Sequence, residues 1–199
     1  MAGYVVLSLF VVRSVWPPPG LKVRPVVVSH MAIEERIGEV LADRGEYVAT
    51  AESCTGGLIG SLITDVPGSS DYFDRSMVTY TYDAKLEELG VPREVLDDVG
   101  AVSEPVARQM ARGIRDGAEV TWGVATTGIA GPTGGTDEKP VGTVYIGVAH
   151  AADWGTGDSW CEVERYVFDG SRTVIKRKIA EQALEDLLEA AERTDPRSA

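Results

Sequence analysis

Segments with helical periodicity alternate with short β-rich segments over most of this chain, and that order is what most constrains its fold. Ile33, Ile37, Val40 and Leu41 recur with the spacing of one helix face. Because the β-rich segments are joined by both βα and ββ connections, we expect an α/β fold with three layers, α/β/α, and a mixed sheet. The other helices are expected at 58–63, 84–89, from Pro92, from Ser103 and at 172–192, and the strands at 47–51, 77–82, 120–126, 141–149 and 161–168.

The charge of the chain is strongly acidic and unevenly spread. The 199 residues hold 19 basic and 31 acidic side chains, a net charge of −12, whereas residues 1–30 hold three basic side chains and no acidic one. Residues 31–199 therefore carry a net charge of −15. Such a surface repels phosphate backbones, so we expect no nucleic-acid or membrane partner. Only five basic residues are lysines, which gives a halophile-like surface.

Residues 1–30 differ from the rest of the chain in composition. Their apolar run at 4–12 is shorter than the roughly 20 residues of a bilayer-spanning helix, and Pro17 to Pro19 follow it without a small-residue cleavage site. The segment is an extension or disordered tail before a natural start at Met31, a structured arm, or a targeting segment. We favour the first interpretation, with one domain at 31–193 and a frayed tail at 194–199.

Cysteine and metal chemistry are not expected to contribute. Cys54 and Cys161 are too few for a disulfide framework and do not have zinc-site spacing. Because proteins of oxidising compartments commonly carry disulfides, we predict a cytoplasmic protein. We also expect no metal and no cofactor.

Three loops rich in small or hydroxyl residues follow predicted strands, at 52–57, 79–85 and 127–135. Loops after strands converge at one edge of an α/β sheet, which is the usual place for a ligand. The first loop leads into a helix, whose free amides would receive an anion. The side chains that these loops supply are Ser53, Thr55, Tyr80, Lys85 and Thr127.

A serine nucleophile at this edge would need a base. Neither His30 nor His150 is near these loops in sequence, so a Ser-His-Asp triad is poorly supported. Lys85 is the only lysine between residues 23 and 138, and a desolvated, neutral lysine can activate a serine. The alternative is that Ser53 and Thr55 only cap a helix and that Lys85 is solvated. The residues by themselves leave both interpretations open.

Six ordered motifs give the chain a specific signature. They are AESCTGG (51–57), DVPGSS (65–70), VTY (78–80), GAVSE (100–104), TGIAGP (127–132) and EKPVGTV (138–144). In order and spacing they resemble the C-terminal domain of competence/damage-inducible protein A (CinA), across about residues 31–192. Characterised members are nicotinamide mononucleotide deamidases, which hydrolyse the carboxamide to nicotinate mononucleotide and ammonia.

The resemblance implies a role for individual residues. Ser53 matches the nucleophile and Lys85 the general base, and Tyr80 matches a hydroxyl residue that lines the site, where we expect it to tune or relay the proton. Tyr82 stands where the family often has Asn, which puts fine substrate contacts in question. The substrate-binding residues that we expect from the resemblance are Thr55, Gly56, Gly57, Thr127, Gly128, Gly131 and Arg172.

The resemblance also implies a nucleotide substrate, a homodimer and a stand-alone deamidase, because thirty residues cannot hold the family's additional N-terminal domain. The alternative is a catalytically silent nucleotide-binding module, or a partner protein in DNA uptake or damage response. The net charge gives the DNA-associated role little support.

Overall fold

The computed structural model describes residues 31–194. Our interpretations of 1–30 as an extension and of 194–199 as a frayed tail therefore fall outside the described residues, except for Thr194, whose amide donates to the carbonyls of Ala190 and Ala191 at 3.2 Å.

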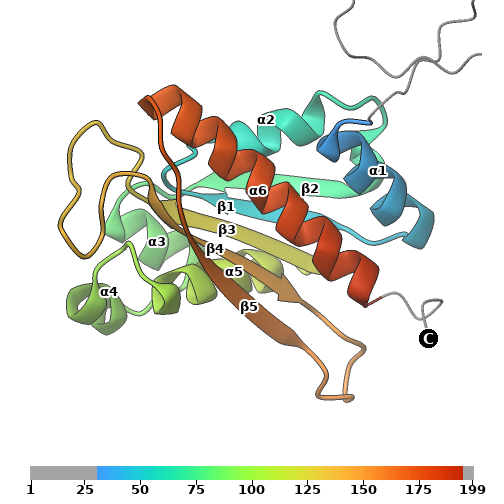
Figure 1. Cartoon of the computed structure of the whole chain (residues 1–199). Coiled ribbons are helices and arrows are strands. Elements are labelled where there is room, and N and C mark those ends of the chain that lie inside the picture. Colours follow the sequence, from blue (N-terminus) through green and yellow to red (C-terminus); the bar gives the residue numbers. More distant parts are fainter. Residues whose placement is uncertain (1–30, 195–199) are drawn as a thin grey trace, which may run out of the picture. The chain divides into compact units, whose positions relative to one another are not determined.

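Five strands form one mixed sheet in the order β2-β1-β3-β4-β5 (Figure 1). β1 is parallel to both β2 and β3, whereas β4 is antiparallel to its neighbours β3 and β5. The predicted mixed sheet is thus confirmed. The strands are β1 (Val48–Glu52), β2 (Phe73–Val78), β3 (Trp122–Gly128), β4 (Thr143–His150) and β5 (Trp160–Val167).

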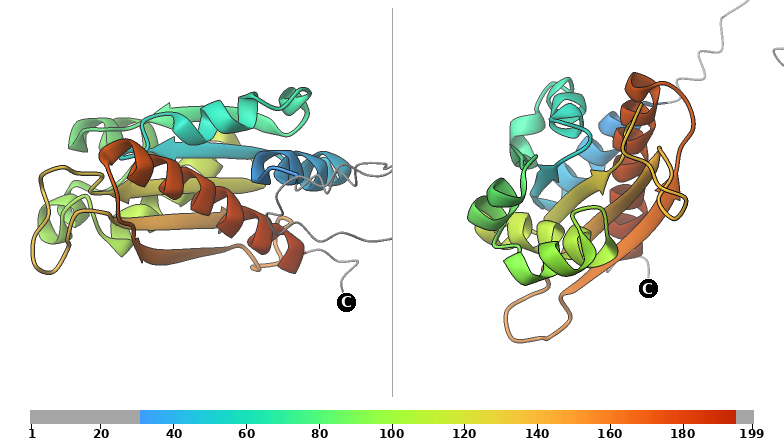
Figure 2. Two further views of the ribbon diagram at one scale, coloured as in Figure 1. Left: turned by 45° about the horizontal axis from the view of Figure 1, so that its top comes forward. Right: turned by 90° about the vertical axis from the view of Figure 1, so that its left-hand side faces the viewer.

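Helices cover both faces of the sheet, which confirms the predicted α/β/α layers (Figure 2). One face packs against α1 (Ile33–Arg44), α2 (Leu58–Thr64) and α6 (Arg172–Arg193), and a short 3-10 helix, η1 (Ser69–Asp71), follows α2. The other face packs against α5 (Glu104–Ala118), beside which lie α3 (Tyr82–Leu89) and α4 (Arg93–Val99). Within residues 31–194, no helix combines the length and the apolar character needed to cross a bilayer.

The helix α5 shows how the sequence specifies this packing. Val106, Met110 and Ile114 recur every four residues, and all three are buried against the sheet. Pro105 stands at the start of the helix, where its missing N–H costs no hydrogen bond. The predicted amphipathic helix after Ser103 is therefore present.

The parallel register of β1, β2 and β3 gathers three loops at one edge of the sheet. Glu52, the last residue of β1, pairs with Val78 at the end of β2 and with Thr126 near the end of β3. Figure 1 shows the loop between β3 and β4 at the same end of the sheet as the start of α6.

The strand predicted at 77–82 lies earlier, at Phe73–Val78, so that prediction is wrong for its last four residues, 79–82. The Thr79 amide still donates to the Glu52 carbonyl, but the chain then turns into α3. The hydroxyl of Thr81 caps that helix by accepting a hydrogen bond from the Ala84 amide, at 3.1 Å. Thr79, Tyr80 and Thr81 therefore form the connection that leads to Lys85.

Candidate active site

Ser53 and Lys85 meet at the edge where the three loops converge. The Ser53 amide donates to the Thr126 carbonyl at 3.0 Å, which ties the first residue after β1 to the neighbouring strand. Lys85 lies within α3, and its Nζ is 3.1 Å from the Ser53 Oγ. Ser53 is half-buried, unlike its fully buried partner Lys85. The two residues that sequence reasoning paired are in hydrogen-bond contact.

The Lys85 side chain is fully buried, at 0% exposure. Its Nζ donates to the Thr79 carbonyl at 2.6 Å and makes a longer contact, 3.5 Å, with the Tyr80 carbonyl. No carboxylate in residues 31–194 forms an ion pair with it. Burial without a counter-charge disfavours the ammonium form and lowers the pKa of Lys85 to about 8. The alternative interpretation of a solvated lysine is therefore wrong.

The carboxylate of Glu52 occupies the N-terminus of α2. It is fully buried and accepts hydrogen bonds from the amides of Gly57 (2.9 Å), Ile59 (3.1 Å) and Gly60 (2.9 Å). The Ser76 hydroxyl donates to the same carboxylate at 3.0 Å. We expected free amides here that would receive an anion from the substrate. That expectation is wrong, because the protein's own anion already uses these donors.

The loop between Ser53 and α2 holds amides that have no acceptor among the described residues. The N-cap of α2 is Gly57, which has no side chain to contribute, so neither Ser53 nor Thr55 caps the helix. The Thr55 hydroxyl is instead buried against the Thr126 hydroxyl, at 2.8 Å. The Thr55 and Gly56 amides donate to no acceptor within the described residues. Gly57, by contrast, has already given its amide to Glu52.

Thr127 contacts a neighbouring loop through its hydroxyl. The Thr127 hydroxyl is almost fully buried and donates to the Ala101 carbonyl at 2.7 Å, while the Ala101 amide donates to the Tyr82 hydroxyl at 3.2 Å. Tyr82 stands where the family often has Asn. Through Ala101, its hydroxyl links the start of α3 to the Thr127 hydroxyl. Gly128 is required for packing, since a Cβ there would lie 2.6 Å from the Thr143 carbonyl oxygen.

Arg172, at the start of α6, joins two of the predicted site residues. Its Nη1 donates to the Gly131 carbonyl at 2.5 Å, and its Nη2 lies 3.4 Å from the Tyr80 hydroxyl. Tyr80 is 60% exposed. Its carbonyl faces Lys85, whereas its hydroxyl faces Arg172. Among the described residues, the Tyr80 hydroxyl therefore makes no hydrogen bond to Ser53 or Lys85 through which it could relay a proton.

The thiol of Cys54, the residue after Ser53, is buried and unreactive. Its side chain is 5% exposed, and burial raises the pKa of the thiol to about 12. A cysteine reacts as the thiolate, and that form is strongly disfavoured here. Both Cys54 and Cys161 are free cysteines.

One functional candidate was missed by sequence reasoning. Lys176 lies one helical turn after Arg172, and a Cβ built on Gly56 would be 3.4 Å from its Nζ. The spacing of four residues from Arg172 was the signal that could have found it.

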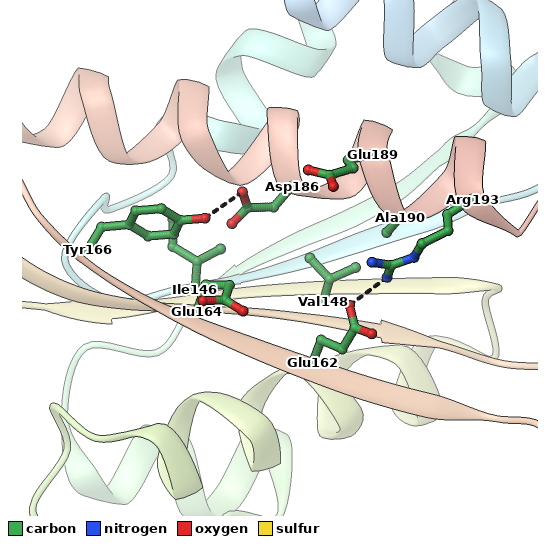
Figure 3. A pocket seen from close by; sticks show the side chains of 9 residues that line it. All are labelled: Ile146, Val148, Glu162, Glu164, Tyr166, Asp186, Glu189, Ala190 and Arg193. Carbon is green, nitrogen blue, oxygen red and sulfur yellow. Dashed lines mark hydrogen bonds and ion pairs between the residues drawn. The ribbon is translucent and has the colours of Figure 1, made fainter.

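A cavity of about 270 Å³ lies elsewhere, between α6 and the strands β4 and β5 (Figure 3). Its sides carry Tyr166 and Arg193, which contact Asp186 and Glu162. With Glu164 and Glu189 also present, carboxylates predominate, so the cavity would repel an anionic nucleotide. It contains none of the predicted site residues. Its lining is Ile146, Val148, Glu162, Glu164, Tyr166, Asp186, Glu189, Ala190 and Arg193.

The family model described as the CinA C-terminal domain matches residues 30–191. The chain belongs to the CinA C-terminal domain family. The earlier resemblance is thereby confirmed.

Relatives of two lengths match this chain. A protein of Shigella flexneri named nicotinamide-nucleotide amidohydrolase PncC is 45% identical over 157 residues, covering 79% of this chain and 92% of that protein. A CinA-like protein of Chlorobaculum tepidum is 49% identical over 162 residues, covering 80% of this chain and 37% of the relative. The chain thus spans about a third of the CinA-like relatives and nearly all of the shorter one.

Solved structures share the fold. The competence damage-inducible protein A of Klebsiella pneumoniae superposes with a TM-score of 0.75 at 31% identity, covering 83% of this chain and all of that one. A competence/damage inducible protein of Agrobacterium tumefaciens gives a TM-score of 0.71 at 42% identity, covering 80% and 95%.

Proposed function

We propose that this chain is an amidohydrolase that converts nicotinamide mononucleotide and water to nicotinate mononucleotide and ammonia. The observation that carries the proposal is the 3.1 Å contact between the buried Lys85 amine and the Ser53 hydroxyl. A base with a pKa of about 8 is matched to proton transfer near neutral pH. The name of the Shigella flexneri relative, which this chain nearly spans, supports the same substrate.

The surroundings of Lys85 favour its action as a base. A neutral amine has two N–H donors and one lone pair. The carbonyls of Thr79 and Tyr80 are placed to accept from the N–H groups, which directs the lone pair toward Ser53. Lys85 takes the proton from the Ser53 hydroxyl as the oxygen attacks the carboxamide carbon of the substrate.

The tetrahedral intermediate then needs donors for its oxyanion. The unpaired amides of Thr55 and Gly56 are the candidates in the loop next to the nucleophile, and a donor of this kind contributes about 3 kcal/mol. Lys85 passes its proton to the departing nitrogen, and the C–N bond breaks to release ammonia. Water adds to the acyl-serine with Lys85 as base, the acyl–oxygen bond breaks, and the proton returns to Ser53.

The other predicted residues hold the substrate or the loops. Arg172, beside Tyr80 and Gly131, supplies a cation at the mouth of the site. Thr127 and Gly128 fix the third loop through the contacts described above. The proposal includes a homodimer, as the family resemblance implies, and a cytoplasmic location, which the small number of cysteines favours.

The test is an ammonia assay with nicotinamide mononucleotide. We expect turnover by the wild type and no turnover by Ser53→Ala or Lys85→Ala, with circular dichroism showing that both variants are folded. Cys54→Ala is the matched control and should keep its turnover, because its thiol has no role in the scheme. Near-normal turnover by Ser53→Ala would overturn the mechanism, and binding without turnover by the wild type would favour a silent nucleotide-binding module.

A further inference from the structure

Three consecutive basic residues on α6 differ in how their charges are balanced. Arg177 forms an ion pair with Glu181 at 2.5 Å, and Lys178 forms one with Asp169 at 2.7 Å. The third of these residues, Lys176, has no carboxylate of residues 31–194 within ion-pair distance. Among these three residues, Lys176 is therefore the one whose charge no carboxylate of the described residues balances.

Lys176 faces the candidate site. It is half-buried, and its Nζ would be 3.4 Å from a Cβ built on Gly56, in the loop that follows Ser53. Arg172 lies four residues earlier on the same helix, so the two side chains project from the same face. The guanidinium of Arg172 contacts Tyr80 and Gly131. Together the two cations reach all three loops that meet at this edge of the sheet.

One other anchor for an anion at this edge, the N-terminus of α2, is not available. The N-terminus of α2 is closed by Glu52, whose carboxylate takes the amides of Gly57, Ile59 and Gly60. A substrate phosphate placed there would meet that buried carboxylate at short range. The acidic surface as a whole also repels a phosphate, so local cations must hold it.

We propose that Lys176 and Arg172 together form the subsite for the phosphate monoester of the substrate, and that Lys176 selects the phosphorylated form. This proposal rests on the proposed function, since it assumes that the reacting carboxamide lies at Ser53. An Arg fork and a Lys point charge are the two side chains that bind phosphate oxygens best. Lys176 can serve the substrate because no protein carboxylate among the described residues neutralises it.

The experiment compares Lys176→Gln with Lys178→Gln on two substrates. Lys178 lies on the same helix, is half-buried like Lys176 and is paired with Asp169, so it is the matched control. We expect Lys176→Gln to lower kcat/KM for nicotinamide mononucleotide about tenfold or more, as for a lost hydrogen bond to a charged group. Its kcat/KM for the unphosphorylated nicotinamide riboside should not change, and Lys178→Gln should match the wild type on both.

Two results would overturn the subsite. One is an equal kcat/KM of the two variants on the mononucleotide, and the other is an equal loss by Lys176→Gln on the mononucleotide and the riboside. Either result leaves the proposed function standing, since the wild type still turns over.

A wild type without turnover would defeat the proposed function, and binding then decides the subsite. The probe is ribose 5-phosphate, with ribose as its control, followed by the thermal unfolding midpoint. A rise in midpoint that is specific for the phosphate, present in Lys178→Gln and lost in Lys176→Gln, supports the subsite. No rise in the wild type, or an equal rise in Lys176→Gln, overturns it.

Discussion

The Glu52 carboxylate accepts a 2.9 Å hydrogen bond from the Gly60 amide, and so joins the last residue of β1 to the first turn of α2. The loop that carries Ser53 is held between these two fixed points. The same contact excludes the substrate phosphate from the N-terminus of α2, because the buried Glu52 carboxylate already lies there. Glu52, the residue before Ser53, thus has a structural role, because it fixes the loop that positions the nucleophile.

Replacing Glu52 by Gln should therefore destabilise the fold. The amide group of Gln would turn a donor toward backbone N–H groups that need an acceptor, and a buried donor left unpaired costs about 1–3 kcal/mol. We expect a loss of about 2 kcal/mol in the free energy of unfolding, measured by urea denaturation. Glu39→Gln, at an exposed position on α1, is the control and should stay within about 0.5 kcal/mol of the wild type. Equal stabilities of the two variants would contradict the capping role.

The rate of ammonia release should depend on pH through Lys85. The active form is the neutral amine, and its fraction rises as pH increases through the pKa of about 8. At nicotinamide mononucleotide concentrations well below KM, the rate is governed by kcat/KM, which reports the pKa of the free enzyme. The value of kcat/KM should therefore rise until about pH 9 and fall about tenfold for each unit below pH 8. The measurement is an ammonia assay between pH 6.5 and 9.5. A flat profile below pH 8, or a rate that falls as pH rises from 7 to 8, would contradict the assignment of Lys85 as the base.

Local sequence patterns predicted most of the elements. Helical periodicity placed α5 and α6, and β-rich segments placed β3 and β4 to within about two residues. The error was at β2, an edge strand whose exposed positions show no regular alternation. Its end is set by pairing with β1 and by the cap at Thr81, which are contacts with other segments.

The catalytic lysine of the candidate site could be predicted because the sequence offers few alternatives to it. Lys85 was identified because no other lysine lies between residues 23 and 138, and the resemblance supplied its pairing with Ser53. The capping by Glu52 and the approach of Lys176 to Gly56 could not be predicted, since both depend on how distant segments pack. From the residues alone, Glu52 could either orient its loop or form a salt bridge with Arg172, and nothing in the sequence chose between these two roles.

Gly60 tests how tightly α2 must approach the sheet. A Cβ on this residue would lie 2.7 Å from the Ser76 Cβ, which is fixed to the backbone of β2 and cannot move aside. Ala normally stabilises a helix interior relative to Gly by about 0.5–1 kcal/mol, but overpacking of this kind costs about 1–3 kcal/mol. Gly60→Ala should therefore be destabilising in urea denaturation.

Gly117→Ala is the matched control for Gly60→Ala. Gly117 also lies in a helix, α5, but a Cβ there would meet no atom within 4 Å. Its substitution should raise the free energy of unfolding by about 0.5–1 kcal/mol. Because Ser76 donates to Glu52, the clash in Gly60→Ala should also disturb the cap beside Ser53 and lower ammonia release, whereas Gly117→Ala should leave ammonia release unchanged. A Gly60→Ala variant as stable as the wild type or more stable would show that α2 can move away from β2 without cost, and unchanged ammonia release by this variant would show that the close approach does not position the serine.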